Sequence, residues 1–326
     1  MQFFDDIRAK RILVLGDLML DKYLWGRVER ISPEAPVPVV DVQKEEYRLG
    51  GAANVAYNLL SLGADPILCG IIGTEPVERS QFLELMNTYG LQTGGLLSLP
   101  HRPTTSKTRV LGDNQQMLRV DRENKQPLTA EEEAQMRGLL DSQMALLPAA
   151  IILEDYNKGL LTPGLIRHVV QQAVLHDIPV LVDPKYTNFL AYGGSTIFKP
   201  NLKELNEALA LTLSREDIPA IVSACALLQQ RMPHRYTFVT LSEQGVLLVD
   251  AAGHHVHFPA HVRKIRDVSG AGDTVISVMA AALAAGLPAE QAAALANLAG
   301  GLVCEIPGVA PIDPLRLRQE AQAILA

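Results

Sequence analysis

Arg11-Ile-Leu-Val-Leu-Gly16, near the start of the 326-residue chain, contains four consecutive apolar residues and ends in glycine. A run that is apolar at every position is typical of a parallel strand covered on both faces of a sheet. Similar runs follow at Ile67–Ile72, Ala149–Leu153, Pro179–Asp183, Thr196–Lys199 and Tyr236–Thr240. Stretches with helical periodicity separate them, such as Pro163–His176. This alternation predicts an α/β fold with a doubly wound, mostly parallel sheet and helices on both faces.

Two stretches break the alternation, because no helix lies between their apolar positions. They are Pro36–Val42 and Thr104–Val110, the second followed by Met117–Asp121. Apolar residues alternate there with polar residues or proline, as in a partly exposed antiparallel sheet. We expect either a small antiparallel β lid, inserted at about residues 36–42 and 102–121, or ordinary surface hairpins. Since the sequence contains no repeat or linker, one domain over residues 1–326 is expected.

The charge and composition of the chain bear on its partners and on its localisation. With 29 lysine and arginine residues against 36 aspartate and glutamate residues, the formal net charge is −7, so no nucleic-acid partner is expected. The N-terminus is too polar for a signal peptide, and the uncharged stretch Val275–Ala289 is shorter than the roughly 20 residues that span a bilayer. Three widely spaced cysteines fit reduced core thiols. We expect a cytoplasmic protein without membrane insertion, in which Val275–Ala289 is a buried helix.

The segment Arg266-Asp-Val-Ser-Gly-Ala-Gly-Asp-Thr-Val275 leads directly into this alanine-rich helix. Gly270, Ala271 and Gly272 would leave backbone N–H groups unobstructed at the helix start, where the helix dipole favours an anion such as a phosphate. A carboxylate at Asp273 would repel that phosphate unless it took a proton from an attacking hydroxyl. A glycine-rich turn with an aspartate N-cap is the alternative interpretation.

Small and polar residues near the first strand suit a sugar. Gly50 and Gly51 permit close approach at the start of another helix, and Asn54 offers a donor and an acceptor to sugar hydroxyls. Asp17 and Asp21 follow the first strand, at the sheet edge where ligands bind in open α/β folds. Helix capping also explains Asp17.

Two groups of residues have the composition of a metal site. Asn201 and Glu204 share a helix face and can hold hydrated Mg²⁺ through water, but a capping box predicts the same pair. His254, His255 and His257 lie in a polar, alternating strand without a further ligand pattern, so an exposed strand face is the better interpretation.

Basic residues on the lid and strand ends point to a substrate that already carries a phosphate. The six candidates are Arg102, Lys107, Arg109, Arg119, Lys158 and Lys185. A single one is ordinarily a solvated surface charge, so the prediction rests on the group.

In order and spacing, these segments resemble the PfkB/ribokinase family of sugar kinases over essentially the whole chain. The Gly50-Gly-x-x-Asn54 segment and the segment from Asp267 to Asp273 look like its two signatures. Within that family the chain is similar to the kinase domain of bacterial D-glycero-β-D-manno-heptose 7-phosphate kinases, alone or joined to an adenylyltransferase. The similar stretches are Gly16–Tyr23, Arg30–Val40, Arg102–Leu111, Asn114–Asp121 and Ser242–Gly245.

The resemblance implies a ribokinase-like fold and ATP-dependent phosphorylation of O1 of the heptose 7-phosphate, for lipopolysaccharide precursors. It makes Asp273 the catalytic base and Gly270, Ala271 and Gly272 the anion hole. Its sugar-binding residues would be Asp17, Asp21, Gly50, Gly51 and Asn54. The charge argument above, which does not depend on the resemblance, adds Lys107, Arg119, Lys158 and Lys185 as residues for the sugar phosphate. Its nucleotide-binding residues would be Asn201, Glu204, Thr240, Gly245 and Asn297, with Asn201 and Glu204 also organising Mg²⁺. A monovalent cation such as K⁺ and a homodimer through the lid strands are further expectations.

Other activities stay open. Another kinase of the family would act on ribose, a fructose phosphate or a nucleoside, and a regulator would bind sugar or nucleotide without catalysis. Two segments depart from the family pattern, since Glu154 stands where serine is expected and Gly308–Pro314 differs from a threonine-containing turn. Because the chain ends near Ala326, no adenylyltransferase domain is expected.

Overall fold

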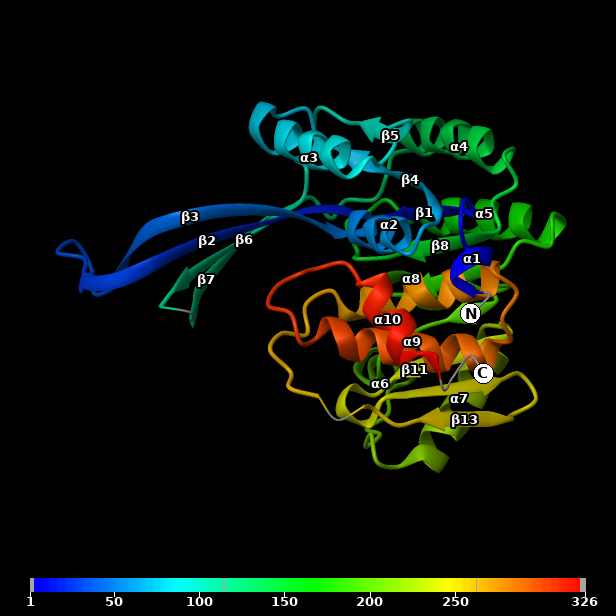
Figure 1. The fold of residues 1–326 in the computed structure, drawn as a ribbon. Helices are drawn as coiled ribbons and strands as arrows, with labels where there is room; N and C mark the ends of the chain where they lie inside the picture. Colours follow the sequence, from blue (N-terminus) through cyan, green and yellow to red (C-terminus); the bar gives the residue numbers. More distant parts are fainter. Residues whose placement is uncertain (1–2, 114, 262, 323–326) are drawn as a thin grey trace.

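The computed structural model describes residues 3–113, 115–261 and 263–322 (Figure 1). Asn114, the first residue of one stretch quoted above, lies outside these ranges. Nine strands form the main sheet: β1 (Arg11–Gly16), β4 (Asp65–Ile72), β5 (Gly95–Ser98), β8 (Ala150–Glu154), β9 (Val180–Asp183), β10 (Ile197–Phe198), β11 (Tyr236–Thr240), β12 (Val246–Asp250) and β13 (His255–Phe258). Their order is β13-β12-β11-β10-β9-β8-β1-β4-β5. Only β12 pairs in antiparallel fashion, with β11 and with β13, so the predicted mostly parallel sheet is confirmed.

Strand β1 shows why the sheet is covered on both faces. Ile12 and Val14 belong to one hydrophobic core, whereas Leu13 and Leu15 belong to a second. The first core contains residues of α1 (Phe3–Asp6), α2 (Ala52–Ser61), α3 (Pro76–Tyr89), α8 (Ala271–Ala284), α9 (Ala289–Val303) and α10 (Pro314–Glu320). The second contains residues of α4 (Ala130–Met144), α5 (Pro163–Leu175), α6 (Leu202–Leu209) and α7 (Ile218–Arg231). Two short 3₁₀ helices, η1 (Tyr186–Asn188) and η2 (Ser242–Gln244), connect strands to the elements that follow.

Helix starts follow local sequence. Thr129 caps α4 in a capping box with Glu132, and Thr162 caps α5, which then begins at Pro163. The predicted buried helix is α8, whose residues from Asp273 to Ala282 are all buried. Within the described residues, no helix combines the length and the apolar character needed to cross a membrane.

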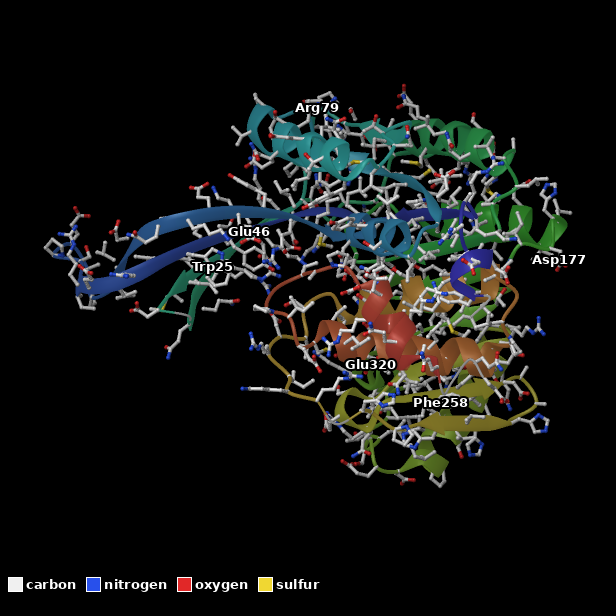
Figure 2. All side chains as sticks on the ribbon, viewed as in Figure 1. Trp25, Glu46, Arg79, Asp177, Phe258 and Glu320 are labelled. Atoms are coloured by element: carbon white, nitrogen blue, oxygen red, sulfur yellow. The ribbon has the colours of Figure 1, made fainter. Side chains whose placement is uncertain are left out.

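A second sheet of four strands projects from one side of the main sheet (Figure 1). Its strands are β2 (Leu18–Ile31), β3 (Pro38–Gly51), β6 (Ser106–Gly112) and β7 (Gln115–Arg122), in the order β3-β2-β6-β7. The β2–β3 and β6–β7 pairs are antiparallel, while β2 and β6 are parallel. Figure 2 labels Trp25 and Glu46 on this lid.

The predicted lid is confirmed, and surface hairpins were the wrong alternative. The lid is larger than the sequence indicated, because β2 and the second half of β3 were not expected. The sequence of β2, LMLDKYLWGRVERI, does not alternate regularly. Asp17 directly precedes this strand, so its interpretation as a helix cap was wrong.

Candidate active site

Helix α8 begins at the glycine-rich segment that was predicted to hold a phosphate. Gly270 precedes the helix with a φ of 78°, and no side chain caps the helix start. The Ala271 N–H donates to the Val268 carbonyl oxygen at 3.2 Å, whereas the Gly272 N–H has no acceptor among the residues that the structure describes. A Cβ on Gly270 would lie 3.0 Å from Asn54 Nδ2, so glycine permits this close approach. The helix start therefore presents donors to an anion, and the alternative of an aspartate N-cap was wrong.

Asp273, the third residue of α8, is almost fully buried. Its Oδ2 accepts a hydrogen bond from Asn54 Nδ2 at 2.7 Å, and its Oδ1 accepts one from the Tyr156 hydroxyl at 2.8 Å. Burial raises the pKa of Asp273 to about 6, although these two hydrogen bonds oppose the shift. A carboxylate with this pKa is ionised at neutral pH and is a stronger base than an exposed aspartate. The site can therefore accept a proton from a hydroxyl group.

Asp183 and Lys199 lie beneath the start of α8 and were not singled out from the sequence. Asp183 ends β9 and Lys199 follows β10; both are buried, and Lys199 Nζ lies 2.7 Å from Asp183 Oδ2. A Cβ on Gly272 would lie 3.6 Å from both of these atoms. A charged residue at the carboxyl end of a buried parallel strand was the signal that could have found them.

Glu154 ends β8 beside Asp183, its register partner in β9. It is fully buried, and neither carboxyl oxygen has a hydrogen-bond partner within the described part of the chain. Burial raises the pKa of Glu154 well above its ordinary value, and the charges of Asp183 and Asp273 raise it further. This surrounding favours the neutral, protonated form of Glu154.

The lid strands come very close together at the predicted sugar site. A Cβ on Gly50 would lie 2.2 Å from Asp21 Oδ2, and one on Gly51 would lie 2.4 Å from the Asp17 carbonyl oxygen. Gly51 also has a φ of 57°, a left-handed conformation that favours glycine. The four residues are therefore brought together at the base of the lid.

Both predicted sugar-binding aspartates already have protein partners. Asp17 Oδ2 accepts hydrogen bonds from the backbone N–H groups of Tyr156 at 2.8 Å and Lys158 at 3.0 Å, so it anchors the loop after β8. Burial raises the pKa of Asp17 to about 6. Asp21 forms an ion pair with Arg109 of β6. A sugar would meet aspartates that the lid and this loop hold in place.

Three of the candidate cations surround Tyr156 or the loop that carries it. Lys107 Nζ of the lid and Lys185 Nζ lie 5.2 Å and 5.4 Å from the centroid of the Tyr156 ring. Lys158 Nζ forms an ion pair of 2.5 Å with Glu123 Oε2. Lys107 and Lys185 thus approach one aromatic ring from separate elements.

Two candidate arginines, Arg102 and Arg119, pair with other groups of the protein. Arg102 is buried and donates to the carbonyl oxygens of Gln126 and Pro127, so its interpretation as a free cation for a phosphate was wrong. Arg119 lies exposed on β7 and pairs with Asp121 at 2.9 Å. Its role toward a phosphate stays a prediction.

Asn201 and Glu204, which the resemblance assigns to the nucleotide, form the capping box that the sequence also predicted. The Asn201 N–H donates to Glu204 Oε2 and the Glu204 N–H donates to Asn201 Oδ1, both at 2.9 Å. Lys185 Nζ donates to Glu204 Oε1 at 2.6 Å. Thr240 forms an isolated parallel bridge with Asn201, so these residues do adjoin.

This arrangement tests whether Mg²⁺ fits. Each oxygen of Glu204 already accepts one hydrogen bond, which favours contact with an ion through its water shell. Mg²⁺ usually keeps several waters, so the pair fits a hydrated ion. His254 and His255 are exposed, but His254 precedes β13, and His257 is half-buried with its Nε2 2.7 Å from the Gln244 carbonyl oxygen, so the exposed-strand interpretation holds only for His255.

Gly245 and Asn297 both contact the chain at the end of β13. A Cβ on Gly245, which has a φ of 86°, would lie 2.1 Å from the Phe258 carbonyl oxygen. Asn297 Nδ2 of α9 donates to the Pro259 carbonyl oxygen at 2.9 Å. Figure 2 labels Phe258 on the same side of the molecule as α9. The two residues predicted from the resemblance therefore border one segment.

A model of the pfkB family of carbohydrate kinases matches residues 9–315. The chain belongs to this family of phosphotransferases. Bifunctional protein HldE of Pelobacter propionicus is 41% identical over 314 residues, which cover 96% of this chain and 64% of that protein. The protein of the same name from Methylobacillus flagellatus is 44% identical over 312 residues, which cover 96% and 63%. This pfkB-family chain thus spans less than two thirds of the length of these relatives.

Solved structures of pfkB-type kinases have the same fold. Phosphofructokinase-2 of Escherichia coli in complex with potassium superimposes with a TM-score of 0.78 at 18% identity, covering 98% of this chain and all of that one. Ribokinase of Arabidopsis thaliana, solved with ribose and ATP, has a TM-score of 0.74 at 17% identity, covering 95% and 98%. The predicted ribokinase-like fold is confirmed.

Proposed function

We propose that this protein transfers the γ-phosphoryl group of ATP to the anomeric O1 of D-glycero-β-D-manno-heptose 7-phosphate. The products would be ADP and the heptose 1,7-bisphosphate, a cytoplasmic precursor of lipopolysaccharide. One observation carries the kinase step, namely the buried Asp273 within the helix start that presents the Gly272 amide. The choice of sugar rests on the resemblance of the lid and signature segments to heptose 7-phosphate kinases.

In the proposed step, Asp273 accepts the proton of the O1 hydroxyl as O1 attacks the γ-phosphorus. The bond from that phosphorus to the bridging oxygen of ADP breaks, and ADP keeps the electron pair. Amides at the start of α8 and the buried Lys199 stabilise negative charge on the transferred group. A lid closed over the sugar excludes the water that would otherwise compete.

Asn201 and Glu204 would hold hydrated Mg²⁺, which supplies positive charge to the nucleotide phosphates. Lys185, which joins Glu204 to the surroundings of Tyr156, links this nucleotide side to the sugar side.

Cations at the base of the lid support a phosphorylated substrate. Lys158 and Asp17 line a small hollow between the lid and the main sheet, and Lys107 Nζ lies 5.2 Å from the ring centroid of Tyr156, two residues before Lys158. We assign Lys107 and Lys158 to the sugar phosphate, since an unphosphorylated sugar does not require them. Lys158 would exchange its partner Glu123 for the phosphate.

We further propose a homodimer through the lid. Ile31, Leu118 and Val120 are exposed lid residues, with 61%, 57% and 52% of their surfaces accessible. Large apolar side chains on a projecting sheet are typical of an interaction surface. A second copy of the chain would cover them.

A transfer screen tests the proposed function. Radiolabelled ATP is incubated with phosphorylated and free sugars, and the modified hydroxyl of each product is identified by NMR. Transfer to O1 of heptose 7-phosphate is expected, with little to ribose, fructose phosphates or nucleosides. Preferred transfer to one of those would identify another kinase of the family, and no transfer at all would identify a binding protein.

Asp273→Asn tests the base in the same assay. We expect ATP binding to stay nearly intact while turnover falls about 10²- to 10⁴-fold. Asp217→Asn is the matched control, since Asp217 caps the distant helix α7 and asparagine caps a helix equally well. Full turnover of the Asp273→Asn protein would remove Asp273 as the base.

A further inference from the structure

The Tyr156 hydroxyl is hydrogen-bonded to the carboxylate of Asp273, on which the proposed transfer depends. Its hydroxyl donates to Asp273 Oδ1 at 2.8 Å, while Asn54 Nδ2 donates to Oδ2 at 2.7 Å. Both oxygens of the base thus accept a hydrogen bond before any substrate arrives. An acceptor hydroxyl can deliver its proton to Asp273 only where it donates to one of these oxygens itself.

Of the two donors, Tyr156 is the one on the lid side. Its ring lies 5.2 Å from Lys107 Nζ of β6 in the lid, and 5.4 Å from Lys185 Nζ. Asn54 lies in α2, is buried, and bonds on its other side to Asn58 of the same helix. Because the sugar is expected between the lid and Asp273, it would meet Tyr156 and leave Asn54 in place.

The loop fixes the backbone of Tyr156 and leaves its side chain only half-buried. The Tyr156 N–H donates to the buried Asp17 Oδ2 at 2.8 Å. Burial, followed by the charges of Asp273 and Glu154, raises the pKa of Tyr156 well above its ordinary value, so the phenol is a neutral donor. A side chain that is not fully buried, on a fixed backbone, can turn away from Asp273 by a rotamer change.

We propose that Tyr156 is a positioning residue that occupies Asp273 until the sugar hydroxyl replaces it, and so prevents Asp273 from activating water against ATP. The inference rests on the proposed function, in which Asp273 is the base. In the reaction that Tyr156 suppresses, a water oxygen bonds to the γ-phosphorus and its proton passes to Asp273. The bond to the bridging oxygen breaks with its electron pair on ADP, which releases inorganic phosphate.

Tyr156→Phe tests this inference, because it removes the hydroxyl and keeps the ring between Lys107 and Lys185. ADP release is measured with Mg²⁺ and ATP but without sugar. We expect hydrolysis to rise about tenfold, the magnitude of a lost hydrogen bond to a charged group. The rise should disappear in the double variant Tyr156→Phe/Asp273→Asn. Tyr156→Met serves the same purpose if the phenylalanine variant does not fold.

Tyr192→Phe is the matched control. The Tyr192 hydroxyl also donates to a carboxylate, Asp155 Oδ2 at 2.7 Å, but it does not contact Asp273. We expect no rise in sugar-independent hydrolysis for this variant. An equal rise in both variants would overturn the proposal, as would no rise in Tyr156→Phe or a rise that survives the loss of Asp273.

The pH profile of Tyr156→Phe provides a second readout that a merely structural role would not produce. The groups around Asp273 are Glu154 of β8, Asp183 of β9, Lys199 after β10 and the Tyr156 hydroxyl, which lowers the pKa of Asp273. Without that hydroxyl, the acidic limb of kcat/KM, which reports the free enzyme, should move to higher pH.

The acidic limb of kcat should stay in place, because the sugar hydroxyl replaces the phenol in the complex of either protein. The proposal would be overturned if the acidic limbs of kcat/KM and kcat moved together, or if neither moved. The proposed function fails separately, if the unaltered protein transfers no phosphoryl group to any sugar in the screen.

Discussion

Three kinds of group surround the buried Asp273. They are a carboxyl group whose surroundings favour its protonated form, an ion pair, and two hydrogen-bond donors. Lys199 is paired with Asp183, and Asn54 and Tyr156 stabilise the ionised form of Asp273. Glu154 has no such partner among the described residues. Ionising Glu154 would place another negative charge near Asp183 and Asp273, so the fold stabilises its proton.

Glu154→Gln should therefore stabilise the protein at alkaline pH. The folded-state pKa of Glu154 is raised above the ordinary value of 4.5, so its contribution to stability is full below that pH and is lost as the pH rises through the folded-state pKa. Glutamine has the same shape and no proton to lose. We expect the free energy of unfolding to increase by at least about 1 kcal/mol at pH 8, the equivalent of less than one pKa unit, with a smaller difference at pH 5.

Urea denaturation at pH 5, 6.5 and 8 measures this effect. Glu132→Gln is the control, because Glu132 is another buried glutamate but accepts a hydrogen bond from the Thr129 N–H. That variant should lose stability. A Glu154→Gln protein less stable than the unaltered one at pH 8 would mean that Glu154 is ionised and paired in solution.

At the scale of elements, the close pairing of β2 and β3 positions the residues that we propose to bind the sugar. Gly50 lies opposite Met19 in this pairing, and its Cα faces Asp21 Oδ2 without room for a side chain. Arg109 of β6 holds Asp21 from the other side. The junction of three lid strands therefore fixes the Asp21 carboxylate.

Gly50→Ala should displace that carboxylate. The new Cβ would lie 2.2 Å from Asp21 Oδ2, so Asp21 must move relative to Arg109. We expect a loss of about 1 to 3 kcal/mol in the free energy of unfolding, as for other overpacked sites, together with a higher KM for the sugar.

Gly138→Ala is the matched control for this substitution. Gly138 lies within α4, and nothing lies within 4 Å of a Cβ built on it. Alanine should be neutral there or stabilise by up to about 1 kcal/mol, as expected inside a helix. Unchanged stability and an unchanged sugar KM in Gly50→Ala would show that the junction can relax.

On the scale of the whole molecule, two cores hold a rigid sheet from which the lid projects (Figure 1). Every described residue of β7, at the lid edge, is exposed, including Leu118. Under the two proposals, the lid would carry part of the sugar site and a second copy of the chain would cover its exposed surface.

Leu118→Glu should separate that dimer. Light scattering is expected to give twice the chain mass of 35.4 kDa for the unaltered protein and the single-chain mass for the variant. Leu175→Glu is the control, since Leu175 is 74% exposed at the end of α5, outside the lid, and should stay dimeric. A single-chain mass for the unaltered protein at micromolar concentration would contradict the lid dimer.

Local patterns in the sequence were sufficient for the central parallel strands β1, β4, β8, β9, β10 and β11, the glycine-rich start of α8 and the candidate base, but not for β5 and β12. Runs such as Ile12–Leu15 are apolar at every position, so they are stable only between two layers. The Gly270–Asp273 segment carries its information in four adjacent residues, because a helix start needs no distant partner to present its N–H groups.

Only the tertiary structure decided what surrounds that base. Glu154, Asp183 and Lys199 end or follow strands that are neighbours in the sheet but far apart along the chain. The raised pKa values of Glu154 and Lys199, and the hydrogen bond from Tyr156 to Asp273, arise from burial and contacts that no local pattern contains. The extent of the lid depended in the same way on the pairing of β2 with β3 and β6, since β2 by itself has no strand periodicity.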